Sequence, residues 1–172
     1  FVNALITLVS VLEQNYMQQL LLWQMGSFSG RSWEQAGILA AVLIPGTLYL
    51  CRFSRQMDMM TFGEEAAQTM GVDTKRVKLK LIVAASLLTG TAVCFTGTIG
   101  FIDLIAPHVA RKVFGPAHKY ALPVSVLFGG AFMVLADLAA RTVMAPMELP
   151  VGAVTALIGA PFFAWVYFKE KA

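Results

Sequence analysis

The sequence predicts an all-α, polytopic transmembrane helical bundle. Of its 172 residues, 58% are hydrophobic and only 13% are charged, whereas soluble domains usually carry about 25% charged residues. Its apolar residues form several continuous runs near the length of about 18 that spans a bilayer. So many runs cannot all be buried in one small soluble core. The basic residues lie between the runs, as loop charges do in membrane proteins, so the net charge of +3 does not indicate a nucleic-acid partner.

We expect about five or six membrane segments, taken in chain order. The first is a truncated span at Phe1–Leu12, because its apolar run is too short to cross a bilayer. It lacks the charged start of a signal peptide, so we expect the chain to be a fragment of a longer protein. The further spans are expected at Gln35–Cys51, Leu81–Ile99, Ile102–Phe114, Leu122–Ala140 and Val151–Phe168.

The distribution of Lys and Arg predicts the orientation of these spans. If residues 52–80 form a cytoplasmic loop and the spans alternate, all of the 13 basic residues except Arg31 and Arg141 lie inside, which is a strong positive-inside bias. This assignment requires Ile102–Phe114 to cross the membrane. A short helix can do so where protein neighbours bury it.

The loop at residues 52–80 contains a predicted short helix. Gly63 and Gly71 are suited to begin and end it, and Glu64 and Glu65 lie favourably near its positive end. The rest of this helix is small or apolar: Ala66, Ala67 and Met70. Such a helix is either a docking surface for a partner or a solvated connector, and its spacing alone does not decide between them.

Two groups of ionisable residues fall within apolar segments. Asp137 and Arg141 are four residues apart, so they lie on one helix face and can pair; such charges either mark function or form a local structural pair. Pro107, His108 and Arg111 lie in the short segment Ile102–Phe114. His108 with Arg111 could move protons or bind a ligand, but we expect a structural role for His108 more than either. His118 falls in a polar loop, where we expect no special role.

Motifs for enzymatic chemistry are missing from the sequence. It contains no zinc-protease motif, no nucleophile elbow and no phosphate-binding loop, and Cys51 and Cys94 fit small core residues. We therefore expect a transport subunit that is not an enzyme and has no cofactor and no metal site. Any energy for transport must come from another subunit.

Five stretches of the chain carry a recognisable pattern: Trp23–Gly30, Gly63–Val72, Gly97–Arg111, Ala136–Arg141 and Glu148–Phe163. Together they cover nearly the whole chain, and in sequence and order they resemble the bacterial permease family that imports iron-siderophores, haem and cobalamin. Thr98 and Asp103 depart from the small residues usual at their positions without breaking the pattern.

The resemblance implies that residues 1–172 are the C-terminal half of a ten-span permease in the inner (plasma) membrane. It also implies a second permease copy, two cytoplasmic ATPase subunits, an external binding protein and a metal-chelate substrate, with iron-siderophores expected before haem or cobalamin. By this resemblance the coupling residues are Gly63, Glu64, Glu65, Ala66, Met70 and Gly71.

The resemblance places binding-protein docking at Arg141 and Glu148, and pathway lining at Phe1–Leu12 and Val151–Phe168. The main alternative is an ion-coupled secondary transporter or channel, for which only Asp137 and His108 could serve as intramembrane relay groups. A further alternative is an intramembrane enzyme, but the sequence contains no set of catalytic residues for one. A purely structural membrane subunit is harder to exclude.

Overall fold

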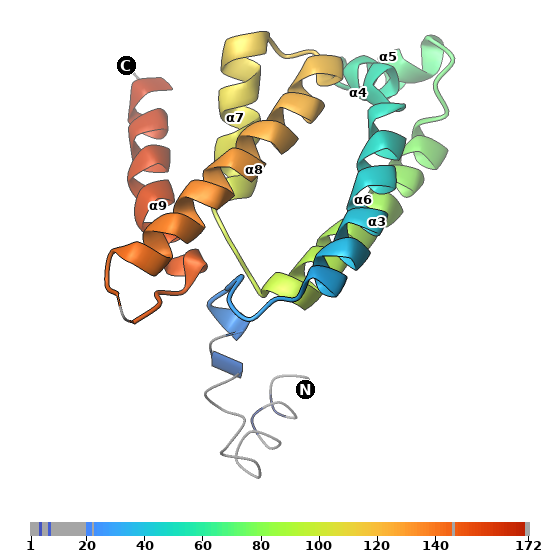
Figure 1. The fold of residues 1–172 in the computed structure, drawn as a ribbon. Helices are drawn as coiled ribbons and strands as arrows, with labels where there is room; N and C mark the ends of the chain where they lie inside the picture. Colours follow the sequence, from blue (N-terminus) through green and yellow to red (C-terminus); the bar gives the residue numbers. More distant parts are fainter. Residues whose placement is uncertain (1–3, 5–6, 8–19, 22, 146, 171–172) are drawn as a thin grey trace.

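The computed structural model describes residues 4, 7, 20, 21, 23–145 and 147–170, and the first expected span therefore lies almost wholly outside the described residues. Over the described part the chain is helical and contains no strand, as predicted (Figure 1). The helices are α3 (Trp33–Cys51), α4 (Ser54–Met60), α5 (Glu64–Thr69), α6 (Thr74–Thr96), α7 (Ile102–Phe114), α8 (His118–Thr142) and α9 (Val151–Glu170).

Three of these helices, α3, α6 and α8, are long and apolar enough to cross a membrane, and α9 carries a shorter apolar stretch at Val151–Val166. Of the most apolar 18-residue stretch of each helix, 0% is buried by the rest of the chain in α3 and in α6, and 11% is buried in α8. Apolar helices this exposed need lipid or further protein around them. The chain is therefore a multi-pass membrane protein.

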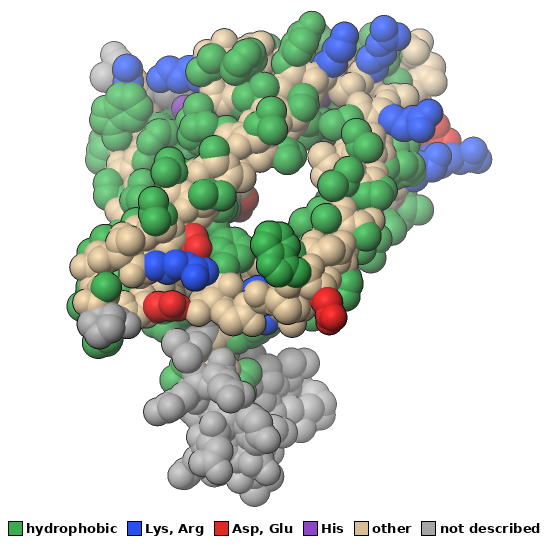
Figure 2. Space-filling view, viewed as in Figure 1, with side chains coloured by type: hydrophobic (Ala, Val, Ile, Leu, Met, Phe, Trp, Pro, Cys, Tyr) green, Lys and Arg blue, Asp and Glu red, His purple; other side chains and the backbone are tan. Residues whose placement is uncertain are grey.

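The helices form two arms, which we name by their members. In the α3–α6 arm the two helices pack against each other; in the α7–α8–α9 arm, α7 and α9 both pack on α8 (Figure 1). Figure 2 shows an opening between the arms. The arms approach each other at both ends of the molecule.

The two ends differ in charge. The end that carries α4, α5 and the start of α8 is rich in Lys and Arg (Figure 2). The positive-inside rule predicts that such an end faces the cytoplasm, and after this prediction we call it the cytoplasmic end. Arg31 and Arg141 lie toward the opposite, external end. Helix α7 runs beside α8 from the cytoplasmic end to about the middle of the molecule, and the extended segment before it leads on to the opposite end (Figure 1), so the chain passes between the two ends here, as the expected crossing requires.

The starts of two helices, α6 and α8, differ from the expected boundaries. The loop 52–80 holds α4, α5 and the first turns of α6, which begins at Thr74 because the Asp73 side chain accepts the Arg76 N–H and caps the helix. Lysines in these first turns favour helix and extend toward water. Likewise α8 begins at His118, inside the expected polar loop.

Candidate functional site

The helix expected between Gly63 and Gly71 is present as α5. Both glycines have positive φ, 106° and 85°, which costs glycine little and other residues much. Glu64 and Glu65 occupy the first turn of α5, where negative charge is favourable. Ala67 is fully buried, so one face of α5 is packed and the other faces solvent.

Side-chain bonds fix α5 to the start of α6. Lys78 Nζ pairs with Glu64 Oε1, and Gln68 Nε2 donates to Thr74 Oγ1 at 3.0 Å. Thr74 is buried. Both Glu64 and Glu65 are exposed, but the Glu64 carboxylate is paired within the chain by Lys78.

The outward surface of this region combines apolar and acidic side chains. Phe62 is 78% exposed and Met70 is 51% exposed, and exposed Glu65 lies between them along the chain. Ala66 is half-buried and contributes less to this surface. Large, solvent-exposed apolar side chains at the basic end of a membrane protein are typical of a surface that contacts a partner.

His118 has a specific contact that the sequence did not indicate. Its backbone N–H donates to Asp58 Oδ1 at 2.9 Å, and its ring Nδ1 lies 2.6 Å from the same oxygen. Burial raises the pKa of Asp58, but the backbone bond, side-chain bond and charge of His118 together outweigh burial and hold the pKa below its ordinary 3.8. The expectation that His118 has no special role was wrong, because a partner 60 residues away leaves no signal in local sequence.

At the external end, Asp137 and Arg141 form the predicted pair, with Arg141 Nε 2.8 Å from Asp137 Oδ2. The Asp137 side chain is 25% exposed and that of Arg141 is 45% exposed. Arg141 therefore keeps part of its guanidinium available at the surface while it neutralises the carboxylate.

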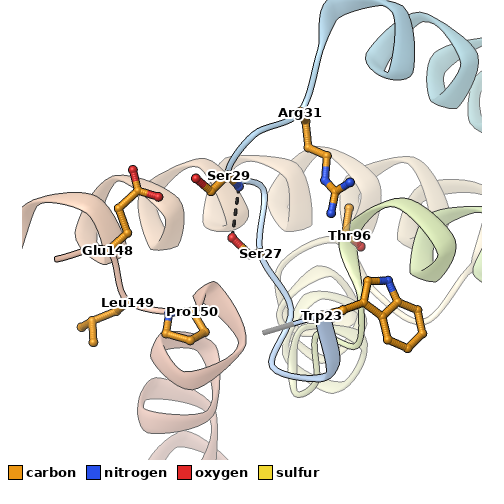
Figure 3. Close-up of a pocket in the computed structure, with 8 residues that line it drawn as sticks. All are labelled: Trp23, Ser27, Ser29, Arg31, Thr96, Glu148, Leu149 and Pro150. Atoms are coloured by element: carbon orange, nitrogen blue, oxygen red, sulfur yellow. Dashed lines mark hydrogen bonds between the residues drawn. The ribbon is translucent and has the colours of Figure 1, made fainter. Parts of the chain in front are cut away.

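Glu148 lies at a separate external cavity of about 330 Å³ (Figure 3). Arg31 extends toward Thr96 and Trp23 on one side of this cavity, and Glu148 lies on the other side of Ser27 and Ser29 (Figure 3). The complete lining is Trp23, Ser27, Ser29, Arg31, Thr96, Glu148, Leu149 and Pro150. Sequence reasoning did not single out Arg31, which was counted only as an external charge.

Close backbone crossings hold the external end together, and we call them the external junction. Gly97 has φ +73°, and a Cβ there would overlap the Trp23 carbonyl oxygen. A Cβ on Gly152 would overlap the Met25 carbonyl oxygen in the same way. The Ser27 N–H donates to the Thr96 carbonyl at 2.9 Å, so the segment before α3, the end of α6 and the start of α9 meet backbone to backbone.

Pro107, His108 and Arg111 lie together on α7, where they help to line a cavity of about 590 Å³ whose lining does not include Asp137. The His108 ring packs edge-on against Phe162 of α9, with centroids 6.1 Å apart, and Pro107 is half-buried. Arg111 is exposed in the last turn. These contacts favour the structural interpretation of His108.

The described residues hold no group of three or more His, Cys, Asp or Glu side chains that could bind a metal ion. The side chains described above at both ends offer ion pairing, hydrogen bonding and apolar contact. Such groups bind and position partners.

Comparison with known proteins identifies relatives over nearly the whole chain. The sequence model of the FecCD transport family matches residues 1–169. The ABC transporter permease protein YvrB of Bacillus subtilis is 39% identical over 99% of this chain and 48% of its own length. The cobalamin import system permease protein BtuC of Halobacterium salinarum is 46% identical over 84% of this chain and 38% of its own.

A permease named for hemin transport and a solved structure are also similar to this chain. The hemin transport system permease protein HmuU of Yersinia pestis is 34% identical over 95% of this chain and 49% of its own length. A structure described as a metal-chelate type ABC transporter in an inward-facing conformation superposes with a TM-score of 0.90 at 29% identity, covering 97% of this chain and 55% of that one. The chain thus spans about half the length of the relatives it matches.

Proposed function

Because the chain belongs to the FecCD transport family, we propose that it forms the C-terminal half of the permease subunit of an ATP-driven importer for metal chelates. One observation carries the proposal: a bundle of membrane-length helices presents a short, exposed helix, α5, at its basic end. The substrate we propose is an iron-siderophore or a related chelate. Relatives named for cobalamin, haem and Fe(3+)-citrate import support this class.

The surface that we propose for the ATPase subunit consists of Phe62, Glu65 and Met70. Its apolar side chains supply area and Glu65 supplies a charge that can steer an oppositely charged partner. Gly63 and Gly71 set the ends of α5, and Ala66 lets the partner approach closely. Glu64 supports this surface from behind through Lys78.

The external surface that we propose for the binding protein combines Arg141, Glu148 and Arg31. Charges at the rim of an interface set register and the rate of association more than affinity. Asp137 holds the Arg141 side chain in one direction, which lowers the entropy lost on docking.

A second permease copy would pack against the α7–α8–α9 arm under this proposal. The exposed apolar side chains of α9, Leu157, Phe163, Trp165 and Phe168, need lipid or protein around them. We propose that α9, together with Phe1–Leu12, lines the pathway between the copies.

The test uses the full-length permease in liposomes with its ATPase subunit and binding protein. We expect Glu65→Arg to lower retention of the ATPase subunit and ATP-driven chelate uptake by about tenfold, because a rim charge of the wrong sign repels the partner. Glu34→Arg is the matched control, because it reverses a charge in the first turn of α3 at the external end and should leave ATPase retention unchanged.

Uptake that needs no ATPase subunit, and that ignores Glu65→Arg, would contradict the proposal. Asp137 would then be the residue to test in an ion-coupled mechanism, although its pairing with Arg141 leaves it less free to exchange ions.

A further inference from the structure

Asp58 and His118 join the two arms of the molecule at the cytoplasmic end. Asp58 belongs to α4, which follows α3 and leads to α5, and His118 is the first residue of α8. The other side-chain bonds described above for α5 run to the start of α6, 14 and 6 residues along the chain. The bond between Asp58 and His118 instead connects segments 60 residues apart.

The attachment at Asp58 uses two bonds. One oxygen, Asp58 Oδ1, receives the backbone N–H of His118 and faces its ring Nδ1. Two donors on one residue, one of them in the backbone, hold the first residue of α8 against α4. The His118 side chain is 11% exposed, so water competes weakly for its bond.

Asp58 also provides the N-terminal cap that α8 lacks. The residue before α8 is Ala117, which has no side chain to cap it, and the first N–H groups of a helix need partners. A carboxylate at this position satisfies one of them and interacts favourably with the helix dipole. The start of α8 therefore depends on a residue in α4.

Helix α8 leads from this attachment to the external surface. It has 25 residues, which corresponds to about 37 Å. Its far end carries Asp137 and Arg141, and Ala136 and Ala140 pack there with Val151 at the start of α9. A displacement applied at His118 therefore reaches both the external surface and α9 through one continuous helix.

We propose that Asp58 and His118 are positioning residues that transmit displacement of the α4–α5 region to the α7–α8–α9 arm. This inference rests on the proposed function, which supplies the displacement through the ATPase subunit. Asp58 and His118 are not among the residues of the proposed ATPase surface, Phe62, Glu65 and Met70, so the inference does not require them to touch the partner. Their loss should uncouple ATP hydrolysis from transport without preventing ATPase docking.

The test compares Asp58→Ala, His118→Ala and the double variant in the full-length importer in liposomes, with uptake per ATP hydrolysed as the readout. We expect about a tenfold loss for Asp58→Ala, which removes both bonds, and about threefold for His118→Ala, which keeps the backbone bond. The double variant should equal Asp58→Ala, because the two residues act through one contact. His118→Asn, whose amide can donate to Asp58, should recover at least half of the loss.

Arg76→Ala is the matched control, since it breaks a highly exposed pair with Asp73 in the same region and should leave uptake per ATP unchanged. The inference is overturned if both single variants stay within twofold of the wild type. It is also overturned if only the amount of assembled complex falls while uptake per ATP is unchanged. A wild-type protein that imports without an ATPase subunit would instead overturn the proposed function, and this inference with it.

Discussion

The two ends of the molecule are held together by different kinds of contact. At the external junction, backbone meets backbone around Gly97 and Gly152, with no room for a side chain. At the cytoplasmic end, side-chain pairs make the connections: Asp58 with His118, and Glu64 with Lys78. Backbone crossings have one geometry set by atomic radii, whereas polar pairs can break and reform at modest cost.

This difference indicates where the molecule can move. A junction closed by backbone overlap keeps the arms in register at the external end. At the cytoplasmic end the polar pairs, Asp58 with His118 and Glu64 with Lys78, can adjust without a backbone clash, so this end can be displaced while its pairs stay intact. The proposed importer would receive force from ATPase subunits at this end and would need such mobility there, and the following predictions test the difference from the largest expected effect to the smallest.

Gly97→Ala should have the largest effect on stability. The φ of +73° and the overlap with the Trp23 carbonyl together should cost about 3 kcal/mol or more. The measurement is the yield and thermal unfolding midpoint of the full-length protein in detergent. Gly90→Ala, inside α6, which ends just before Gly97, is the control: no atom lies within 4 Å of its Cβ position, so it should be neutral or stabilise by up to about 1 kcal/mol. Equal effects at the two sites would show that the junction is not tightly packed.

Asp137→Ala should have an intermediate effect. It leaves the Arg141 guanidinium without its partner in a partly buried position, and we expect about 1 kcal/mol of destabilisation. Binding-protein association should also slow, because Arg141 loses its fixed direction. Thermal unfolding and association kinetics measure the two effects separately. An association rate equal to that of the wild type would remove Arg141 from the proposed docking surface.

Asp58→Asn should have the smallest effect on stability, and it should depend on pH. Because the folded state holds the Asp58 pKa below 3.8, the carboxylate stabilises the fold above that pH, and this stabilisation is lost as the pH falls through the lowered value. The variant keeps acceptor atoms but loses the charge at the start of α8, which is worth about 0.5–1 kcal/mol. The difference in unfolding midpoint between wild type and variant should be present at about pH 5 and smaller at about pH 3. A difference that grows on acidification would contradict the lowered pKa.

The sequence predicted the parts of the structure that depend on local patterns. Apolar runs identified α3, α6, α8 and α9, Gly63 and Gly71 bounded α5, and the spacing of four paired Asp137 with Arg141. Helix ends were less predictable: Asp73 and Asp58 cap α6 and α8, so both helices extend beyond their apolar runs.

Contacts between distant segments could not be predicted. The bond between Asp58 and His118, and the crossing of Gly97 over Trp23, depend on how the arms come together. The stretch Gly97–Arg111 stood out through a resemblance, which did not indicate what Gly97 contacts. The structure supplies the physical reason for Gly97, because no other residue fits beside the Trp23 carbonyl.

The central claim, that α5 faces the ATPase subunit, is tested most directly by cross-linking. Cysteine is placed at Glu65 or Glu34 in the full-length permease, with Cys51 and Cys94 replaced by serine, and a short bifunctional thiol reagent is added to the assembled importer. The account predicts that position 65 cross-links to the ATPase subunit, while position 34 does not and reacts instead with a membrane-impermeant reagent from outside. Cross-linking of the ATPase subunit to position 34, or labelling of position 65 from outside, would contradict the orientation and the proposed function together.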